Sequence, residues 1–91
     1  MQIEFDDAKN VANVRSRDLS FEQVVDFDFE TAFFKQDTRR DYGETRIRAL
    51  GFLEDRLHAL VFTEIANGIR VISFRKANKR EVKIYEQETQ T

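Results

Sequence analysis

The sequence contains no cysteine, no proline and no tryptophan, and it has a single histidine, His58, which we expect to be structural. Without cysteine, neither a disulfide framework nor a thiolate metal site can form. One histidine would leave any metal site to carboxylate ligands, which argues against zinc, and we expect neither a cofactor nor a metal. No apolar run approaches the roughly 20 residues that cross a bilayer. The first residues also lack the basic and apolar regions of a signal peptide, so we expect a cytoplasmic protein without membrane contact.

Acidic and basic residues are unevenly distributed along the chain, whose 91 residues fit one domain and whose net charge is −2. Residues 1–45 hold 11 acids and 6 bases, whereas residues 46–91 hold 6 acids and 9 bases. Six of the bases fall within residues 69–83, against Glu81 as the single acid. Such a segment is compatible with a local site for a polyanion, and equally with a solvated basic surface.

The first half of the chain predicts two short strands and two helices. Residues 3–5 suit a strand, and Asp6 or Asp7 suits the N-cap of a helix that runs to about residue 15. The apolar positions of that helix would be Ala8, Val11, Ala12 and Val14. Ser20, with Gln23 three residues later, predicts the capping box of a second helix. Its buried stripe would be Phe21, Val24, Val25 and Phe27. Residues 32–34 predict a further strand, followed by a polar, turn-rich segment.

Three strands and a helix are predicted in the second half. The strands would span residues 45–53, 56–64 and 69–75, with tight turns at residues 54–55 and near 67–68. Asn78 and Glu81 predict a second capping box at the start of the last helix, which we expect to fray into a tail over residues 87–91. The order β-α-α-β-β-β-β-α predicts an α+β fold, with one compact domain over residues 1–91 and helices packed against an antiparallel sheet.

Alternation along these strands sorts the arginines by face. In the first strand of the meander, Arg46 and Arg48 share a face. In the third, strict alternation puts Arg70 and Arg75 on opposite faces, with Phe74 beside Arg70. The last two arginines therefore need not belong to one site.

The usual signatures of an enzyme are missing from the sequence. It shows no Ser-His-Asp arrangement, no Gly-rich phosphate loop and no paired carboxylates at a recognisable spacing. RNA can nevertheless be cleaved when its own 2′-hydroxyl is positioned against the adjacent phosphate and arginine or lysine stabilises the added negative charge. Such a site needs a cluster of fixed cations more than a strong base, and the segment from Arg70 to Arg80 can supply one.

Three short motifs occur in order between residues 4 and 85. The first joins EFDDAK at residues 4–9 and Asn13 to LSFE at residues 19–22. The second is GETR at residues 43–46, with Gly51 five residues beyond its arginine. The third is RVISFRKANKRE at residues 70–81, followed by Tyr85. Each is weak alone, but together they resemble the BrnT family of toxins from type II toxin–antitoxin systems.

The resemblance implies a RelE-like ribonuclease fold and a toxin that inhibits translation by cleaving RNA. It also implies a BrnA-like antitoxin with a ribbon-helix-helix part, contact with operator DNA only through that antitoxin, and a toxin homodimer within the complex. We expect catalysis, without a metal, from Arg75, Arg46 and Arg17. Other contacts to RNA are expected from Arg70, Lys76, Arg80, Arg56 and Tyr85.

One departure from the family keeps other functions open. Where the family carries Lys-His-Gly, this chain has Ser16, Arg17 and Asp18. Arginine stays protonated near neutral pH and is a poor general base. The second hypothesis is therefore a degenerate, non-catalytic toxin homologue that binds its antitoxin and takes part in operon repression. The third is an unrelated small α+β domain with an acidic partner.

The candidate residues also have structural interpretations. Arg75 can form a structural salt bridge, Arg46 beside Glu44 can pair across the sheet, and Arg17 can lie in a solvated turn. Tyr85 can pack in the core rather than stack on a base, and the spacing of Glu81 explains it as a cap.

A cluster of four phenylalanines has two interpretations as well. It forms either a core under the second helix or an exposed patch for the antitoxin or a second toxin copy. Its members are Phe27, Phe29, Phe33 and Phe34.

Overall fold

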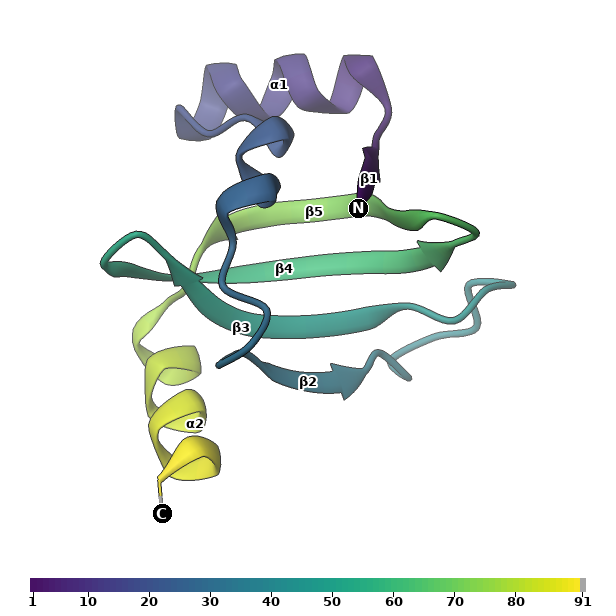
Figure 1. Ribbon diagram of the computed structural model, residues 1–91. Coiled ribbons are helices and arrows are strands. Elements are labelled where there is room, and N and C mark those ends of the chain that lie inside the picture. The colour runs from purple at the N-terminus through teal and green to yellow at the C-terminus, as the bar shows by residue number, and fades with distance from the viewer. Residues whose placement is uncertain (91) are drawn as a thin grey trace.

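The computed structural model describes residues 1–90 and consists of one five-stranded sheet, two α-helices and a short 3₁₀-helix (Figure 1). The elements are β1 (Gln2–Glu4), α1 (Asp7–Arg17), the 3₁₀-helix η1 (Phe21–Asp26), β2 (Phe33–Gln36), β3 (Ile47–Leu53), β4 (Arg56–Ile65), β5 (Gly68–Lys76) and α2 (Lys79–Thr89). The strands are arranged in the order β1-β5-β4-β3-β2. The predicted α+β class and element order are confirmed.

The sheet is mixed, so the prediction of a wholly antiparallel sheet is wrong at one edge. Strands β2 to β5 pair antiparallel, but β1 runs parallel to β5, with Ile3 opposite Ile69. The backbone N–H of Gln2 also donates to the carbonyl of Asn67 at 3.0 Å. Alternation marks which residues face a core but not the direction of a partner strand, and a strand of three residues carries little pattern.

Each helix begins at a predicted cap. The Asp6 carboxylate accepts a hydrogen bond from the first turn of α1. Ser20 and Gln23 form the capping box of η1, and Asn78 and Glu81 form that of α2. Because a capping box satisfies two otherwise unpaired N–H groups, these short polar patterns place the helix starts accurately.

The core lies between η1 and the face of the sheet that η1 covers. Its buried residues are Leu19, Phe21, Val24, Phe27, Ala49, Leu53, Leu60, Phe62, Ile69, Val71 and Phe74. Val25 was predicted to be buried but is 67% exposed. A 3₁₀-helix has three residues per turn, so Phe21, Val24 and Phe27 line one side and Val25 points away. Of the phenylalanine cluster, Phe27 is buried in this core and Phe34 is exposed.

Helix α1 lies at the β5 end of the molecule and buries none of its residues (Figure 1). Two of its predicted apolar positions, Val11 and Val14, are exposed. Two polar side chains hold the helix: the Asn13 amide donates to the carbonyls of Leu19 and Phe74, at 2.9 and 3.0 Å, and Oδ1 of Asn10 accepts the backbone N–H of Phe21 at 2.8 Å.

A β-bulge in β5 overturns the predicted faces of this strand. Val61 pairs with Ser73 and Phe62 with Val71, which leaves Ile72 as the extra residue. A bulge shifts the alternation by one position, so Val71 and Phe74 both face the core. Arg70 and Arg75 therefore lie on the same face of the sheet, not on opposite faces.

Helix α2 packs on the other face of the sheet. The rings of Tyr85 and Phe52 pack edge to face, with their centres 5.6 Å apart. The Tyr85 hydroxyl donates to the carbonyl of Thr31 at 2.9 Å. Fraying over residues 87–91 stays a prediction: the helical backbone is described through Thr89, and residue 91 lies outside the described residues. Within residues 1–90, no helix is long and apolar enough to cross a membrane.

Candidate functional site

A groove of about 350 Å³ opens on the face of the sheet opposite the core. Its walls come from β2 and the segment that follows it, from β3, β4 and β5, and from α2. Five basic side chains line it: Lys35, Arg39, Arg46, Arg48 and Arg75. Three acidic side chains line it as well: Asp37, Glu81 and Glu88. The groove is therefore positively charged on a protein whose overall charge is negative.

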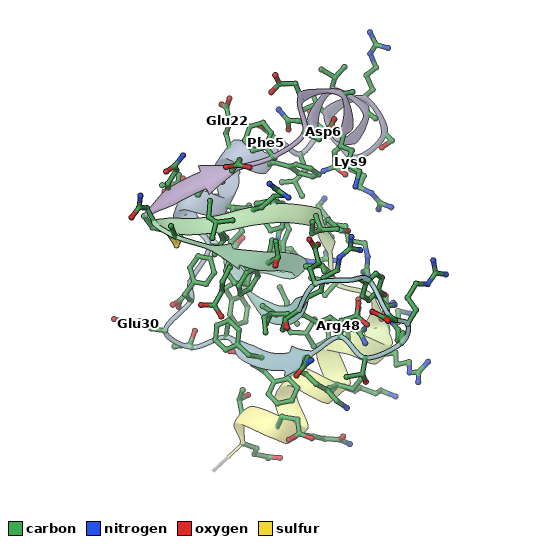
Figure 2. All side chains as sticks on the ribbon, turned by 90° about the vertical axis from the view of Figure 1, so that its right-hand side faces the viewer. Phe5, Asp6, Lys9, Glu22, Glu30 and Arg48 are labelled. Atoms are coloured by element: carbon green, nitrogen blue, oxygen red, sulfur yellow. The ribbon has the colours of Figure 1, made fainter. Side chains whose placement is uncertain are left out.

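The pairing of the strands brings these residues together. Lys35 on β2 stands opposite Arg48 on β3, and Asp37 donates its backbone N–H to the carbonyl of Arg46 at 2.8 Å. On β5, the residue next to the core residue Phe74 is Arg75, which faces the groove. Figure 2 shows Arg48 on the α2 side of the sheet, away from Asp6 and Lys9 at the start of α1.

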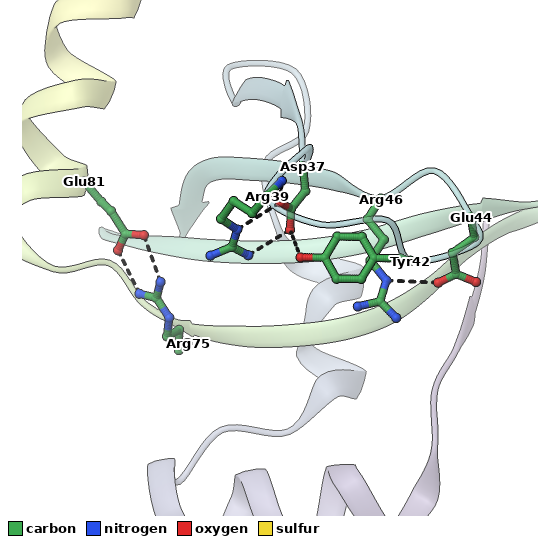
Figure 3. Close-up of polar contacts among 7 residues, drawn as sticks. All are labelled: Asp37, Arg39, Tyr42, Glu44, Arg46, Arg75 and Glu81. Carbon is green, nitrogen blue, oxygen red and sulfur yellow. Dashed lines mark hydrogen bonds and ion pairs between the residues drawn. The ribbon is translucent and has the colours of Figure 1, made fainter.

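Arg75 is held in place by a two-pronged ion pair with Glu81 (Figure 3). Its Nη1 and Nη2 donate to Oε1 and Oε2 of Glu81 at 2.7 and 2.9 Å, and Nη1 also donates to the carbonyl of Lys76 at 3.3 Å. The hydrogen bonds from Arg75 lower the pKa of Glu81, and the same pair raises the pKa of Arg75. Glu81 is therefore an ionised carboxylate that both caps α2 and orients an arginine. The structure thus shows both structural interpretations: Arg75 forms a salt bridge, and Glu81 caps a helix.

A second ion pair forms around Asp37, where β2 has just ended. This carboxylate accepts hydrogen bonds from Nε and Nη2 of Arg39, at 2.9 and 2.8 Å, and from the Tyr42 hydroxyl at 3.1 Å (Figure 3). The Asp37 side chain is 1% exposed. The bonds from Arg39 hold the pKa of Asp37 well below its usual range, so the buried group is charged and fully partnered.

Arg46 occupies the wall beside this cluster. Its Nε donates to Oε2 of Glu44 at 3.1 Å, and its guanidinium carbon lies 4.1 Å from the centre of the Tyr42 ring. The interpretation of Arg46 as one half of a salt bridge is therefore also observed, together with a cation–π contact.

Arg48 differs from the other arginines of the groove. It is half-buried, and among residues 1–90 its guanidinium forms neither a hydrogen bond nor an ion pair with a carboxylate. Its charge still acts on the site, because it helps to lower the pKa of Glu81. The sequence placed Arg48 on the face of Arg46 but did not single it out, and its two-residue spacing from Arg46 was the available signal.

The remaining candidates from the sequence lie outside the groove. Arg17 is the last residue of α1, and Arg70 pairs with Glu4 at 2.9 Å. Arg56 donates to the carbonyl of Ala77 at 3.1 Å. Tyr85 is occupied in packing α2. Lys76 and Arg80 are exposed and do not line the groove. Of the eight proposed site residues, the structure thus brings Arg46 and Arg75 together, and it adds Lys35, Arg39, Tyr42 and Arg48.

The single histidine lies in the core. His58 packs against Phe74, with ring centres 5.3 Å apart, and its Nδ1 lies 2.8 Å from the carbonyl oxygen of Arg56. Burial lowers its pKa. Across the described part of the chain, no three His, Cys, Asp or Glu side chains are grouped as a metal ion would require.

Comparison with known proteins identifies the family. A family model described as the ribonuclease toxin BrnT of type II toxin–antitoxin systems matches residues 5–81. No curated protein and no solved structure matches the chain, so the likeness to RelE stays a prediction. The matched residues include every strand of the groove and extend to Glu81. The chain therefore belongs to the BrnT family of ribonuclease toxins of type II toxin–antitoxin systems.

Proposed function

We propose that this protein is an endoribonuclease whose active site is the groove, and that it inhibits translation by cleaving RNA. Membership of a ribonuclease toxin family supplies the class of activity. The observation that supports the site is the gathering of five basic side chains in one groove on an acidic protein. Local positive potential attracts the phosphate backbone even when the net charge of the protein is negative.

Arg75 is well prepared to bind a phosphate. A guanidinium has five N–H donors, and Arg75 uses three of them for Glu81 and the carbonyl of Lys76. The Nε–H and one Nη2–H remain, and they project in parallel from one edge of the plane. Such a pair matches two oxygens of a phosphate, so Glu81 orients Arg75 without occupying this edge. Arg48 lines the same groove, and none of its donors has a hydrogen-bond partner among residues 1–90.

The proposed reaction uses the RNA's own nucleophile. The 2′-oxygen forms a bond to the adjacent phosphorus while the bond to the 5′-oxygen of the next nucleotide breaks. Water accepts the proton of the 2′-hydroxyl, and the leaving 5′-oxygen takes a proton from water. The products end in a 2′,3′-cyclic phosphate and a 5′-hydroxyl. Arg48 and Arg75 stabilise the negative charge that develops on the phosphate oxygens, and Arg46 contacts the substrate from the wall.

This scheme does not depend on the position where the family carries a histidine. Arg17 stands there, at the end of α1 and outside the groove. We therefore assign the chemistry to Arg48 and Arg75 rather than to Arg17. A degenerate toxin that binds its antitoxin without cleaving RNA is the second candidate, favoured by the three groove arginines that are already paired with carboxylates.

The partners are part of the same proposal. A toxin of a type II system has a protein antitoxin, and we propose a BrnA-like antitoxin with a ribbon-helix-helix part that binds operator DNA. The toxin would then reach DNA only through its antitoxin, and a toxin homodimer would form within the complex. Co-expression with the product of a neighbouring short reading frame, followed by co-purification and mass determination, tests these partners.

Induction of the toxin alone in a bacterium tests the activity. Arg48→Ala and Arg75→Ala remove the proposed phosphate contacts, whereas Arg70→Ala removes an exposed arginine on β5 outside the groove. We expect wild type and Arg70→Ala to arrest growth and fragment RNA, and the two groove variants to do neither. Intact RNA with the wild type would favour the degenerate toxin. Equal toxicity of all four proteins would refute the groove as the site.

A further inference from the structure

Tyr42 is anchored at the groove by a buried charge. It lies half-buried in the segment between β2 and β3. Its hydroxyl donates to Oδ2 of Asp37 at 3.1 Å, and the Asp37 side chain is almost completely buried. Asp37 is in turn fixed by the two-pronged bond from Arg39. The ring of Tyr42 is therefore held in one orientation.

The Arg46 guanidinium makes a cation–π contact with this ring. Its guanidinium carbon lies 4.1 Å from the ring centre, and the bond from Nε to Glu44 at 3.1 Å fixes its rotation (Figure 3). The Arg46 side chain is 25% exposed. The guanidinium thus lies over the Tyr42 ring, and the pair forms a cationic step in the groove wall.

The place of this step suits a nucleobase. Bases that are not paired stack on aromatic rings and on arginine planes, whereas bases inside a duplex are already stacked. Tyr42 and Arg46 line the same groove as Arg48 and Arg75, the proposed phosphate contacts. A strand that laid its phosphate on those arginines would bring a neighbouring base to the wall. Tyr85, the aromatic residue that the sequence offered for stacking, has its ring packed against Phe52 instead.

We propose that Tyr42 and Arg46 form a nucleobase-binding platform, with Asp37 as its positioning residue, that makes the groove selective for single-stranded RNA. The inference rests on the proposed function, because it takes RNA as the ligand of the groove. Beyond that function, the inference states that the protein recognises a base of the RNA and that the RNA is single-stranded. It also gives the Asp37 cluster a role that phosphate binding does not require.

Binding to RNA that cannot be cleaved tests the platform apart from catalysis. The probe is a fluorescent 2′-O-methyl oligoribonucleotide, compared with the same strand carrying abasic sites and with its duplex. Fluorescence anisotropy would be measured for wild type, Arg46→Lys, Tyr42→Leu and Tyr42→Phe, with Arg70→Lys as the control outside the groove. Circular dichroism would verify that each variant is folded.

We expect wild type to bind the base-bearing single strand about 10-fold or more tightly than the abasic strand, the range that stacking of a base commonly gives. Arg46→Lys keeps the charge but loses the plane, so this ratio should fall towards one while affinity for the abasic strand changes about twofold at most. Tyr42→Leu should behave likewise, Tyr42→Phe should lose part of the ratio, and Arg70→Lys should keep it.

Three outcomes would overturn the inference. The platform is refuted if Arg46→Lys and Tyr42→Leu retain the wild-type ratio, or if wild type binds the duplex as tightly as the single strand. If wild type binds neither the base-bearing nor the abasic strand, the groove is not an RNA site. That third result refutes the proposed function along with the platform, and the abasic strand separates it from the other two.

Discussion

Glu81 joins the start of α2 to Arg75, so its replacement should weaken both. The carboxylate accepts the backbone N–H of Asn78 at 3.0 Å and forms the two-pronged bond to Arg75. Glu81→Ala removes cap and ion pair together. Glu81→Gln keeps an oxygen for the Asn78 N–H and removes the charge. Comparison of the two variants therefore separates the capping contribution from that of the ion pair.

The expected magnitudes follow from burial. A lost cap costs about 1 kcal/mol of the free energy of unfolding. Breaking a fully buried ion pair costs about 3–5 kcal/mol. The Arg75 side chain is 32% exposed and the Glu81 side chain 8%, so water can partly solvate the arginine that is left and about 1–2 kcal/mol is expected. Glu81→Gln should therefore cost about 1–2 kcal/mol and Glu81→Ala about 2–3 kcal/mol. The latter corresponds to a fall in Tm of about 10–20 °C for a domain of this size.

Urea and thermal unfolding followed by circular dichroism measure both effects, and pH supplies an internal control. The pKa of Glu81 is lowered in the folded state, so its charge stabilises the fold above the ordinary pKa of 4.5. That stabilisation is lost as the pH falls through the lower folded pKa. The stability difference between wild type and Glu81→Gln should thus be constant from pH 5 to 8 and shrink below about pH 4. A difference near zero at pH 7, or one unchanged at pH 3, would refute this reasoning.

Three further changes probe the fold. Asn13→Ala removes the two hydrogen bonds that tie α1 to Leu19 and to Phe74 of β5, and should lower the free energy of unfolding by about 1–3 kcal/mol in a urea titration; no loss would mean that other contacts hold α1. A Cβ at Gly68 would clash with the backbone of Gln2, so Gly68→Ala should displace β1 and cost about 1–3 kcal/mol, whereas unchanged stability would argue against the parallel pairing. Burial lowers the pKa of His58 from 6.5, so stability should fall as the pH drops below that value, and His58→Phe should remove this dependence. An NMR titration of His58 at its ordinary pKa would contradict that.

The elements that local sequence patterns specify were predicted well. Both capping boxes lie where the polar pairs Ser20–Gln23 and Asn78–Glu81 indicate. The turn after β3 also follows its pattern: Leu53 pairs with Arg56 across two residues, and Glu54 takes the left-handed backbone with φ of 56°. These features depend on neighbours in the chain, so a single sequence contains the information.

Features that depend on distant partners were not predicted. The bulge at Ile72 arises from the pairing of β4 with β5, and no residue type in β5 announces it. Strict alternation, which leaves the extra residue out of account, therefore assigned part of β5 to the wrong face of the sheet. It put Arg70 on the face opposite Arg75. The burial of Asp37 has the same origin, because its place beside Arg46 depends on the pairing of β2 with β3.

The candidate site was predicted in part for the same reason. The closing motif indicated Arg75, and alternation put Arg46 and Arg48 on one face, so the cations of the sheet could be found from the sequence. The sequence could not show which of these arginines have carboxylate partners. The ion pair of Arg75 with Glu81 depends on the position of α2 against the groove, and the lack of a carboxylate partner for Arg48 among residues 1–90 depends on the whole fold.

Cleavage of RNA by the purified toxin, free of antitoxin and with a metal chelator present, tests most directly whether the groove is the active site. The substrate is a 5′-labelled single strand, with a matched strand carrying a 2′-deoxy nucleotide at the cleaved position. We expect fragments ending in a 2′,3′-cyclic phosphate and none from the deoxy strand. Arg48→Ala and Arg75→Ala should each lower kcat/KM by about 10²–10³, and Arg70→Ala about twofold at most. No cleavage by the wild type, or an equal loss in Arg70→Ala, would contradict the assignment.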